Sequence, residues 1–516
     1  MQFDTIIQGG TVVDGTGKRP PFPADLGIVH DEISAVGELD DAQASRTIDA
    51  RGKTVSPGFI DVHVHSEIAL LGGRDQMGSV RQGVTTQLSA PDGFGWAPLP
   101  PKLSKELWHY TQFAYGDAEL SFDWACAEDY LSIFTGRIPA NLYPQVPHCA
   151  VRLEAMGWEP RPATDAELAR MEETTREWLE AGAGCLCLGL DYQPSANADL
   201  KELVRLSRLA DSYGAIYAAH IRYQQIGRKK AWEETIELAK QSGIPVHISH
   251  ERVDDESAEL LDRVDREDID LTFESYLYPA GMTHLAMMLP LRFQDGNVVE
   301  RMEVLKRPET REASLPHLQK SLGERGDQIV GYTASGRYIG MTLAEAAESE
   351  NKPWVEFAYD LTVEENGVET LIFPWQTPRE KFQSTLDQTA AHPRMMIASD
   401  GVYNIPHPHP RSYGCFVQYL ARYVRERKLV SLEEAIYKMS GFPAERFGIS
   451  DRGRIAKGLA ADVVVFDPET VSDRSTWKNP IEPPVGVDWV LVNGVPVVKE
   501  GGLTGTLPGR VLRHEF

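Results

Sequence analysis

Short apolar runs alternate with longer amphipathic runs through the middle of the chain, and this alternation limits the possible folds more than any other feature. After the capping box Thr164-x-x-Glu167, apolar residues recur at helical spacing, and the pattern returns in the segments that follow. Each amphipathic run leads into a run with the composition of a buried strand, at 184–190, 215–220, 244–250 and 269–273. This order predicts parallel β/α units.

Two glycines mark where helices are expected to end. Gly214 follows the helix that carries Leu200 to Leu209, and Gly243 follows the helix around Trp232, so each is expected to be a C-cap. Another helix is expected near 257–264. No glycine-rich phosphate fingerprint follows a strand, which disfavours a dinucleotide-binding fold. The predicted class is therefore α/β, a (β/α)₈ TIM-like barrel.

Both ends of the chain have the composition of β-structure. Glycine-rich turns separate short apolar runs near the start, and Asn493-Gly494 between two valine-rich runs is a hairpin signal near the end. We expect one small β-sandwich formed by both termini, over 1–56 and 447–516, around a barrel over 57–446.

The stretch from about 285 to 345 breaks the β/α rhythm and is rich in charge. It is expected to be an insertion. Two interpretations stay open, a lid over the barrel mouth and a structural excursion away from it.

The charge balance limits the partners. The 516 residues include 76 acidic and 52 basic side chains, a formal net charge of −24. Such a surface repels phosphate backbones and anionic lipid, so neither nucleic acid nor a membrane is an expected partner. With no secretory leader, no apolar run long enough to span a membrane and no zinc-finger spacing among the five cysteines, we expect a cytoplasmic protein. A homo-oligomer stays open.

The most specific chemical signal is the segment Gly58-Phe59-Ile60-Asp61-Val62-His63-Val64-His65. Side chains alternate along a strand, so His63 and His65 point to the same face. Two imidazoles at the end of one apolar strand suit a single metal ion, and a structural pair is the alternative.

Three later strands end in further ligand-type side chains. His220 ends the strand 215–220 and His250 ends the strand 244–250, while Asp400 follows the apolar run 395–399. Active sites of barrels form where the strands end, so these residues are expected to join the two histidines. A carboxylate there also suits proton transfer.

These segments make the chain resemble the amidohydrolase superfamily and, within it, the N-acyl-D-amino-acid deacylase (D-aminoacylase) family. The likeness covers nearly the full length. It rests on GFIDVHVHSE, VRQGVTTQLSAPDGFGWAP, YAAHIR, IPVHISHERV, SYLYPAGMT, IASDG, HPRSYG and KGLAADVVVFDP. The resemblance implies a barrel with a β-sandwich from both termini.

The resemblance also implies the metal ligands. It places one divalent ion, expected to be Zn²⁺, on His63, His65 and Asp400, and another on His220 and His250. Where the family has a ligating cysteine in an Asn-Cys-Gly-Phe segment, this chain has Asp92. A carboxylate can bridge two cations but is a harder ligand than a thiolate, so one or two ions, and a divalent metal other than zinc, stay open. The alternative for Asp92 is a loop residue beside a degenerate site.

Substrate-binding residues follow from the same likeness. Arg411 matches the arginine of the family, Arg252 stands where a lysine is usual, and Tyr276 matches a tyrosine. Two arginines can hold a carboxylate bidentately. Met282 replaces a serine, which implies a bulkier or less polar N-acyl compound. The alternative for Arg411 is a structural ion pair.

The expected reaction is hydrolysis of a small-molecule linear amide to a carboxylic acid and an amine. The substrate would be an N-acyl amino acid or a related N-acyl compound, with D configuration as one option, and Asp400 would be the catalytic acid–base group. A cyclic-amide hydrolase or deaminase of the same superfamily is one alternative, although the strand at 185–191 lacks the lysine that cyclic-amide hydrolases usually carboxylate. A non-catalytic barrel that has lost its metal is the other.

Overall fold

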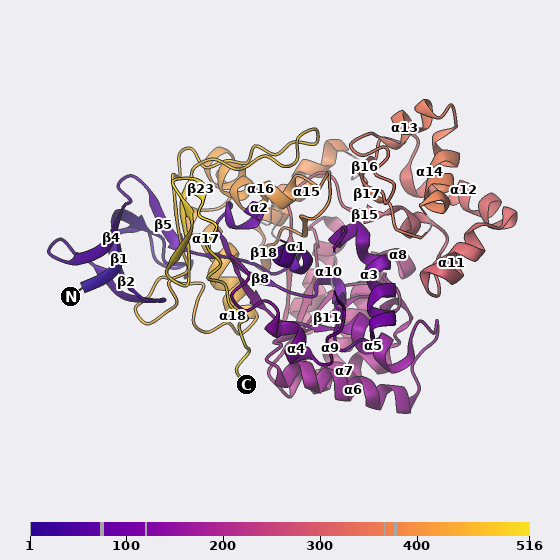
Figure 1. The fold of residues 1–516 in the computed structure, drawn as a ribbon, viewed down its shortest axis with the longest axis horizontal. Helices are drawn as coiled ribbons and strands as arrows, with labels where there is room; N and C mark the ends of the chain where they lie inside the picture. Colours follow the sequence, from indigo (N-terminus) through magenta and orange to yellow (C-terminus); the bar gives the residue numbers. More distant parts are fainter. Residues whose placement is uncertain (1, 73–76, 119–120, 366, 376–378) are drawn as a thin grey trace.

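The computed structural model describes residues 2–72, 77–118, 121–365, 367–375 and 379–516, and a parallel barrel forms its centre (Figure 1). Three sheets supply the eight strand positions of the barrel, which we call staves. Some staves consist of two short strands. In order they are β6 (Phe59–Asp61) with β7 (Val64–His65), β8 (Val84–Leu88), β9 (Asn141–Tyr143) with β10 (Val146–Pro147), β11 (Cys185–Gly189), β12 (Ile216–His220), β13 (Val246–Ile248), β14 (Leu271–Ser275), and β18 (Met395–Ile397) with β19 (Gly401–Val402).

The last stave closes the barrel against the first. β19 pairs in parallel with β7, with Gly401 opposite Val64. Just before this ladder, the backbone N–H of Asp400 donates to the carbonyl of His63 at 2.8 Å. The predicted (β/α)₈ barrel is confirmed, and its closure brings the first and last staves together.

Helices that connect the staves cover the barrel. They include α3 (Pro101–Tyr115), α5 (His148–Met156), α6 (Asp165–Glu180), α7 (Leu200–Asp211), α9 (Arg228–Ser242), α10 (Asp255–Arg266), α15 (Arg379–Ala391) and α16 (Arg411–Gln418). Apolar side chains from helices and strands form one large core, in which Trp178 and Trp232 are fully buried.

The helix-end predictions are mostly confirmed. Thr164 and Glu167 form the reciprocal capping box that begins α6, and Gly243, with φ 82°, is the C-cap of α9. The prediction for Gly214 is wrong, because α7 already ends at Asp211 with Ser212 as its C-cap. Gly214 instead lies in the following turn, where its φ of 69° favours glycine.

The fourth helix is longer than the expected 257–264. Asp254 caps α10 through the backbone N–H of Ser257, which extends the helix to Asp255–Arg266. Aspartate and serine at these positions are a capping pattern of the kind that also begins α6.

Both termini combine into one nine-stranded sheet, drawn in indigo and yellow at one end of Figure 1. β5 (Thr54–Pro57) and β20 (Val463–Phe466) pair antiparallel and join the two halves. The remaining strands are β1 (Gln2–Val12), β2 (Phe22–Val29), β3 (Glu32–Gly37), β4 (Gln43–Asp49), β21 (Val487–Val492), β22 (Val495–Lys499) and β23 (Gly502–Leu503). The sheet folds around an apolar core of its own, which confirms the sandwich.

The hairpin between β21 and β22 is also confirmed. Asn493 and Gly494 occupy its turn with φ values of 49° and 77°, as a type I′ turn requires.

The stretch around 285–345 forms a lobe at the end of the molecule opposite the sandwich (Figure 1). It contains α11 (Val298–Leu305) and α12 (Pro308–Leu322), followed by α13 (Leu343–Ser349) and α14 (Trp354–Glu364). Three antiparallel strands connect the lobe to the barrel: β15 (Thr283–His284), β16 (Ile329–Tyr332) and β17 (Leu371–Phe373). The exact domain boundaries and the role of this lobe as a lid stay predictions.

Across the described ranges, no helix combines the length and the apolar character that crossing a membrane requires.

Candidate metal centre and substrate cavity

Residues at the ends of the first and last staves meet in a buried cluster. The Nε2 atoms of His63 and His65 lie 3.8 and 3.5 Å from the same oxygen, Oδ1 of Asp400. All three side chains are almost fully buried. The two histidines therefore share one face as the period of the strand predicts, and the closing stave adds a carboxylate.

Asp92 reaches the same cluster from the turn after β8. Its Oδ1 lies 3.7 Å from Nε2 of His63, and its Oδ2 lies 3.7 Å from Nε2 of His65. Ligand-type atoms of His63, Asp92 and His250 also lie within 4.8 Å of one another. Asp92 is thus placed between the two predicted ligand groups.

His220 and His250 complete the cluster on the other side. Nδ1 of His220 lies 3.0 Å from Nε2 of His250, and the imidazole rings of His250 and His63 have their centroids 5.2 Å apart. The structure therefore gathers all six residues predicted as metal ligands: His63, His65, Asp92, His220, His250 and Asp400.

Three of these six residues have left-handed backbone conformations. Asp92, His250 and Asp400 have φ values of 55°, 41° and 44°. Such values cost conformational energy in residues other than glycine and cluster at functional sites. Each of the three follows a barrel strand, where this local turn directs the side chain toward the centre.

Glu274, which the sequence analysis did not identify, contacts one histidine from each of the two predicted ligand groups. Its Oε1 lies 3.0 Å from Nδ1 of His63 and accepts a 2.9 Å hydrogen bond from the backbone N–H of His250. Its other oxygen pairs with Nε2 of His247. Burial alone would raise the pKa of Glu274, but His247 and His63 hold it well below its usual value.

Asp191 plays the corresponding role for His220. Its Oδ2 lies 2.9 Å from Nε2 of His220 and accepts from the backbone N–H of Gln224. A carboxylate on Nε2 leaves Nδ1 of His220 to face the cluster. The available signal for Glu274 and Asp191 was a carboxylate within or directly after an apolar strand.

Two further buried carboxylates hold the loops that carry the aspartates. Glu67 accepts from the backbone N–H of Ala90, two residues before Asp92. Asp61 accepts from the backbone N–H of Ser399 at 3.0 Å, next to Asp400. Burial raises the pKa values of both Glu67 and Asp61 to about 7, although these hydrogen bonds act in the opposite direction.

Arg411 is fully buried behind Asp400. Its Nη2 lies 2.6 Å from Oδ2 of Asp400, and its Nε donates to the backbone carbonyl of Asp400 at 2.8 Å. Burial alone would raise the pKa of Asp400, but Arg411 and the neighbouring imidazoles hold it far below its usual value. This geometry favours the ion-pair interpretation of Arg411.

A cavity of roughly 970 Å³ opens onto the cluster, and Arg252 and Tyr276 line it. The guanidinium of Arg252 lies 5.1 Å from the ring centre of Tyr276. Its Nη2 donates to the carbonyl of Tyr278 at 3.3 Å, and its buried Nε has no hydrogen-bond partner in the described part of the chain. Arg252 is thus a cavity-lining cation with donors left for an anion.

The rest of the cavity combines an apolar wall with a charged mouth. Arg228, which also lines the cavity, is already paired with Glu251 and Asp254. The apolar wall consists of Phe113, Tyr192, Met282, Met287 and Met288. Part of this wall, Met287 and Met288, comes from the inserted stretch.

Comparison with known proteins gives a family match. The profile described as the amidohydrolase family matches residues 46–275 and 372–498. The D-aminoacylase of Alcaligenes xylosoxydans xylosoxydans is 33% identical over 524 residues, covering 99% of this chain and 97% of that protein.

Solved structures agree along the full length. The N-acyl-D-glutamate deacylase of Bordetella bronchiseptica, solved with zinc and a phosphonate inhibitor, superposes with a TM-score of 0.83 at 31% identity. A D-aminoacylase described with a binuclear metal centre superposes with a TM-score of 0.82 at 32% identity. Each comparison covers 99% of this chain and 100% of the other.

Proposed function

This chain belongs to the amidohydrolase family, and from that premise we propose that it is a metal-dependent hydrolase of a small N-acyl amino acid or related N-acyl compound. The products would be a carboxylic acid and an amine. The observation that carries the proposal is the convergence of six ligand-type side chains, four buried and two partly buried, beside a cavity that Arg252 lines.

The residues of the cluster fit divalent metal. Nε2 of His63 and Oδ1 of Asp92 are buried and have no hydrogen-bond partner among the described residues. Four imidazoles and two carboxylates form a donor set suited to zinc and to harder divalent ions. We propose that His63, His65 and Asp400 would hold one ion and that His220 and His250 would hold a second, with Asp92 as a further ligand between the two groups.

With a divalent ion held there, the pKa of a bound water molecule would fall from about 16 towards about 7, and the amide carbonyl would be polarised. Asp400 is ionised at neutral pH because its pKa lies far below the usual value. Arg411 holds Oδ2 of Asp400, which leaves Oδ1 toward the cluster. That oxygen takes the proton of the attacking water and returns it to the leaving amine, which needs an acid to depart.

Substrate orientation is assigned to Arg252 and Tyr276. The free donors of Arg252 suit the carboxylate of the amino-acid part. Direct substrate contact by Arg411 stays a prediction, since the side chain is fully buried behind Asp400. The methionines of the wall favour an apolar acyl group or side chain, so apolar N-acyl substrates should be hydrolysed faster than those with acidic side chains.

The reaction is tested by a hydrolysis screen of N-acyl D- and L-amino acids, aryl amides and cyclic amides with several divalent metals. Release of a free amino acid from an N-acyl amino acid is the expected result. Ring opening or ammonia release without amino-acid release would instead identify a cyclic-amide hydrolase or a deaminase. No turnover, no bound metal and no restoration by added metal would identify a non-catalytic barrel.

The role of Asp400 is tested by Asp400→Asn. We expect kcat to fall by about 10²- to 10⁴-fold while circular dichroism and thermal unfolding show an intact fold. Asp165→Asn, at an exposed carboxylate on α6, is the matched control and should leave kcat unchanged. Near-normal turnover by Asp400→Asn would exclude the proton-transfer role.

A cytoplasmic location is proposed on separate grounds. All five cysteines are free thiols rather than disulfides, as in a reducing compartment. Cell fractionation tests the location, and sedimentation of the purified protein tests whether it forms a homo-oligomer.

A further inference from the structure

His247 lies on β13 with its side chain inside the barrel. The alternate residues of β13 and of its neighbour β14, among them Val246 and Phe273, pack in the large core under the helices. His247, Thr272 and Glu274 therefore face the barrel interior. In the parallel register His247 pairs with Thr272. We call these three residues the interior polar group.

Apolar side chains surround the interior polar group. Ala218 is the register partner of His247 on the neighbouring strand, and Met396 is the register partner of Glu274. Both belong to an apolar cluster of their own, which also contains Phe447. The ring of Phe447 packs edge-on against the imidazole of His247, with the ring centroids 5.3 Å apart. His247 and Glu274 are 2% and 1% exposed, so water does not reach them from outside.

The neighbours of His247 fix the position of its proton. Its Nδ1 lies 2.8 Å from Oγ1 of Thr272, and its Nε2 contacts Oε2 of Glu274. Burial lowers the pKa of His247, although Glu274 opposes the shift, so the ring is neutral at pH 7. Because the pKa of Glu274 lies well below its usual value, its carboxylate only accepts. The proton of His247 is therefore on Nε2, and Nδ1 accepts from the hydroxyl of Thr272.

Glu274 needs this donor because its two oxygens have different partners. Oε1 lies 3.0 Å from Nδ1 of His63 and accepts from the backbone N–H of His250 at 2.9 Å, whereas Oε2 contacts His247. A buried carboxylate oxygen that loses its donor favours protonation or rotation of the group. Either change would weaken the hold of Glu274 on His63 and His250.

Stability alone gives a weak reason for the interior polar group. Apolar residues of similar volume in place of a buried charged pair are often neutral or stabilising, and the surrounding interior is already apolar. The group is better explained by what Glu274 does at its other oxygen, where it reaches a proposed metal ligand.

We propose that His247 is a positioning residue for the metal, with Thr272 as its partner. Thr272 fixes the proton on Nε2 of His247, and His247 in turn holds Glu274. Glu274 then orients His63, whose Nε2 faces Oδ1 of Asp400 at 3.8 Å. The inference rests on the metal ligands assigned in the proposed function.

The proposal is tested by the Zn²⁺ affinity of the full chain, measured in competition with a chromophoric chelator. His247→Leu should lower this affinity by about tenfold, because Glu274 loses the donor that keeps it charged and in place. Thr272→Val keeps the shape and removes only the hydroxyl, so it should lower the affinity by about threefold. His247→Gln can still donate an amide N–H to Glu274 and should recover most of the affinity that His247→Leu loses.

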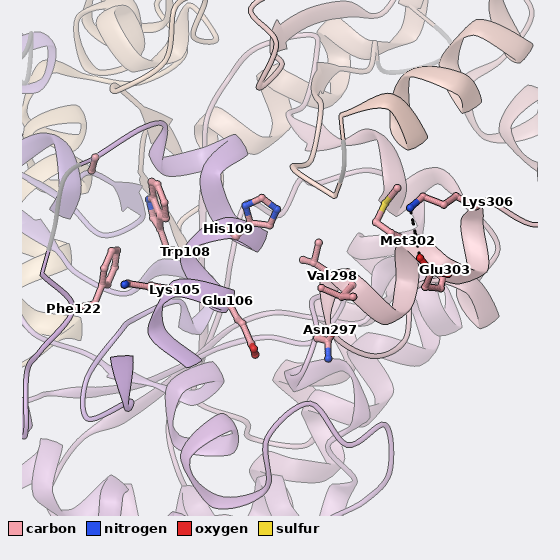
Figure 2. A pocket seen from close by; sticks show the side chains of 12 residues that line it. Lys105, Glu106, Trp108, His109, Phe122, Asn297, Val298, Met302, Glu303 and Lys306 are labelled. Atoms are coloured by element: carbon pink, nitrogen blue, oxygen red, sulfur yellow. Dashed lines mark ion pairs between the residues drawn. The ribbon is translucent and has the colours of Figure 1, made fainter. Parts of the chain in front are cut away.

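Two other histidines serve as controls. His284→Leu removes a partner of Glu369, which lies 3.0 Å away in another buried pair, so it should destabilise the fold without changing Zn²⁺ affinity. His109→Leu removes a histidine of a pocket of roughly 600 Å³ between α3 and α11, which shares no lining residue with the metal cavity (Figure 2). This variant should change neither property. Equal losses of Zn²⁺ affinity in His284→Leu and His247→Leu would overturn the proposal, because metal binding would then follow the stability of the fold.

A double-mutant cycle tests whether His247 acts through Glu274. Glu274→Met removes the link to His63, so the addition of His247→Leu to this variant should cause no further loss of Zn²⁺ affinity. Wild-type affinity in His247→Leu, or additive losses in the double variant, would overturn the inference and leave the proposed function intact. A wild type that neither binds Zn²⁺ nor gains turnover from added metal would overturn the proposed function and this inference with it.

Discussion

In the proposed metal site, residue 92 would set the chemical hardness of the donor set. Asp92 contributes carboxylate oxygens 3.7 Å from both His63 and His65. A thiolate at this position, which the family resemblance led us to expect, would favour softer ions. The proposed bridge should therefore discriminate less strongly for Zn²⁺ against Mn²⁺ than a thiolate bridge does.

Asp92→Cys tests this effect of ligand hardness. We expect the ratio of the Zn²⁺ affinity to the Mn²⁺ affinity to rise by at least about tenfold, because the thiolate prefers the softer ion. Competition with a chromophoric chelator measures both affinities. Asp92→Asn keeps the shape without the charge and should weaken both ions together, whereas an unchanged ratio in Asp92→Cys would contradict the role of Asp92 as a ligand.

Glu274 is expected to act on the metal through His63. Its carboxylate holds Nδ1 of His63 and the backbone of His250, which orients both imidazoles. Loss of such an outer partner lowers metal affinity by about 10- to 100-fold. Glu274→Gln should show this loss in chelator competition before any assay of turnover.

The control for Glu274→Gln is a similar buried pair elsewhere. Glu369 lies 3.0 Å from Nδ1 of His284 in the strands near the inserted lobe. Glu369→Gln should destabilise the fold as Glu274→Gln does, since each loses a buried carboxylate. An equal loss of metal affinity in both variants would contradict a specific effect of Glu274 on the metal through His63.

At the scale of the elements, half of the six cluster residues lie in tight turns that directly follow barrel strands. The left-handed backbones of Asp92, His250 and Asp400 each follow a barrel strand. The sequence predicted that His250 and Asp400 would end strands, because apolar runs stop there. It did not predict the turns, because aspartate and histidine adopt this conformation only where tertiary contacts compensate for its cost.

A buried lysine near the end of α15 makes the stability of the fold depend on pH. Lys438 lies in the π-helical turn Tyr437–Gly441 and donates to the carbonyls of Ala390 and His392 at 3.2 and 2.6 Å. Burial lowers its pKa from 10.5 to about 8, although Glu434 opposes the shift. A cation near the C-terminus of a helix is favourable, but desolvation outweighs this contact.

The lowered pKa predicts a rise of stability with pH. Between pH 8 and 10.5 the unfolded chain keeps the proton that folded Lys438 has lost, so the free energy of unfolding increases with pH. Relative to Lys438→Met, the wild type should gain up to about 3 kcal/mol over this window. Urea unfolding at several pH values measures the difference, and the wild type compared with Lys230→Met should show no such gain, because that variant keeps Lys438.

At the scale of the whole molecule, one buried network joins the sandwich to the barrel. Asp462, just before β20, pairs with Arg452 at 2.5 Å and accepts from Asn141 of β9 at 3.0 Å. It also accepts from the backbone N–H of Asn493 in the hairpin turn at 2.7 Å. The carboxylate thus connects β9 of the barrel to two segments of the C-terminal part of the sandwich.

Removal of this carboxylate should destabilise the whole chain. Asp462→Ala leaves Arg452 buried without its main partner, which is expected to cost about 3–5 kcal/mol in urea unfolding. Asp451→Ala removes the exposed partner of the same arginine and should cost no more than about 1 kcal/mol. Equal losses of unfolding free energy in the two variants would show that the buried Asp462 stabilises the fold no more than the exposed Asp451.

Local periodicity by itself determined the barrel and which strand ends would bring most of the cluster residues together. Apolar runs of strand length that end in His65, His220, His250 or Asp400 imply parallel strands whose ends lie at one face. Each of these inferences uses residues close together in sequence. That is why these members of the cluster were predictable without knowing any contact between strands.

Only the tertiary structure decided the contacts between distant segments. Asp92 enters the cluster because β8 lies beside β6, and Glu274 meets His63 across the barrel interior. The pocket between α3 and α11 joins segments nearly two hundred residues apart. Such contacts depend on how the elements pack, and a local pattern of apolar and polar residues carries no information about which distant side chain it will face.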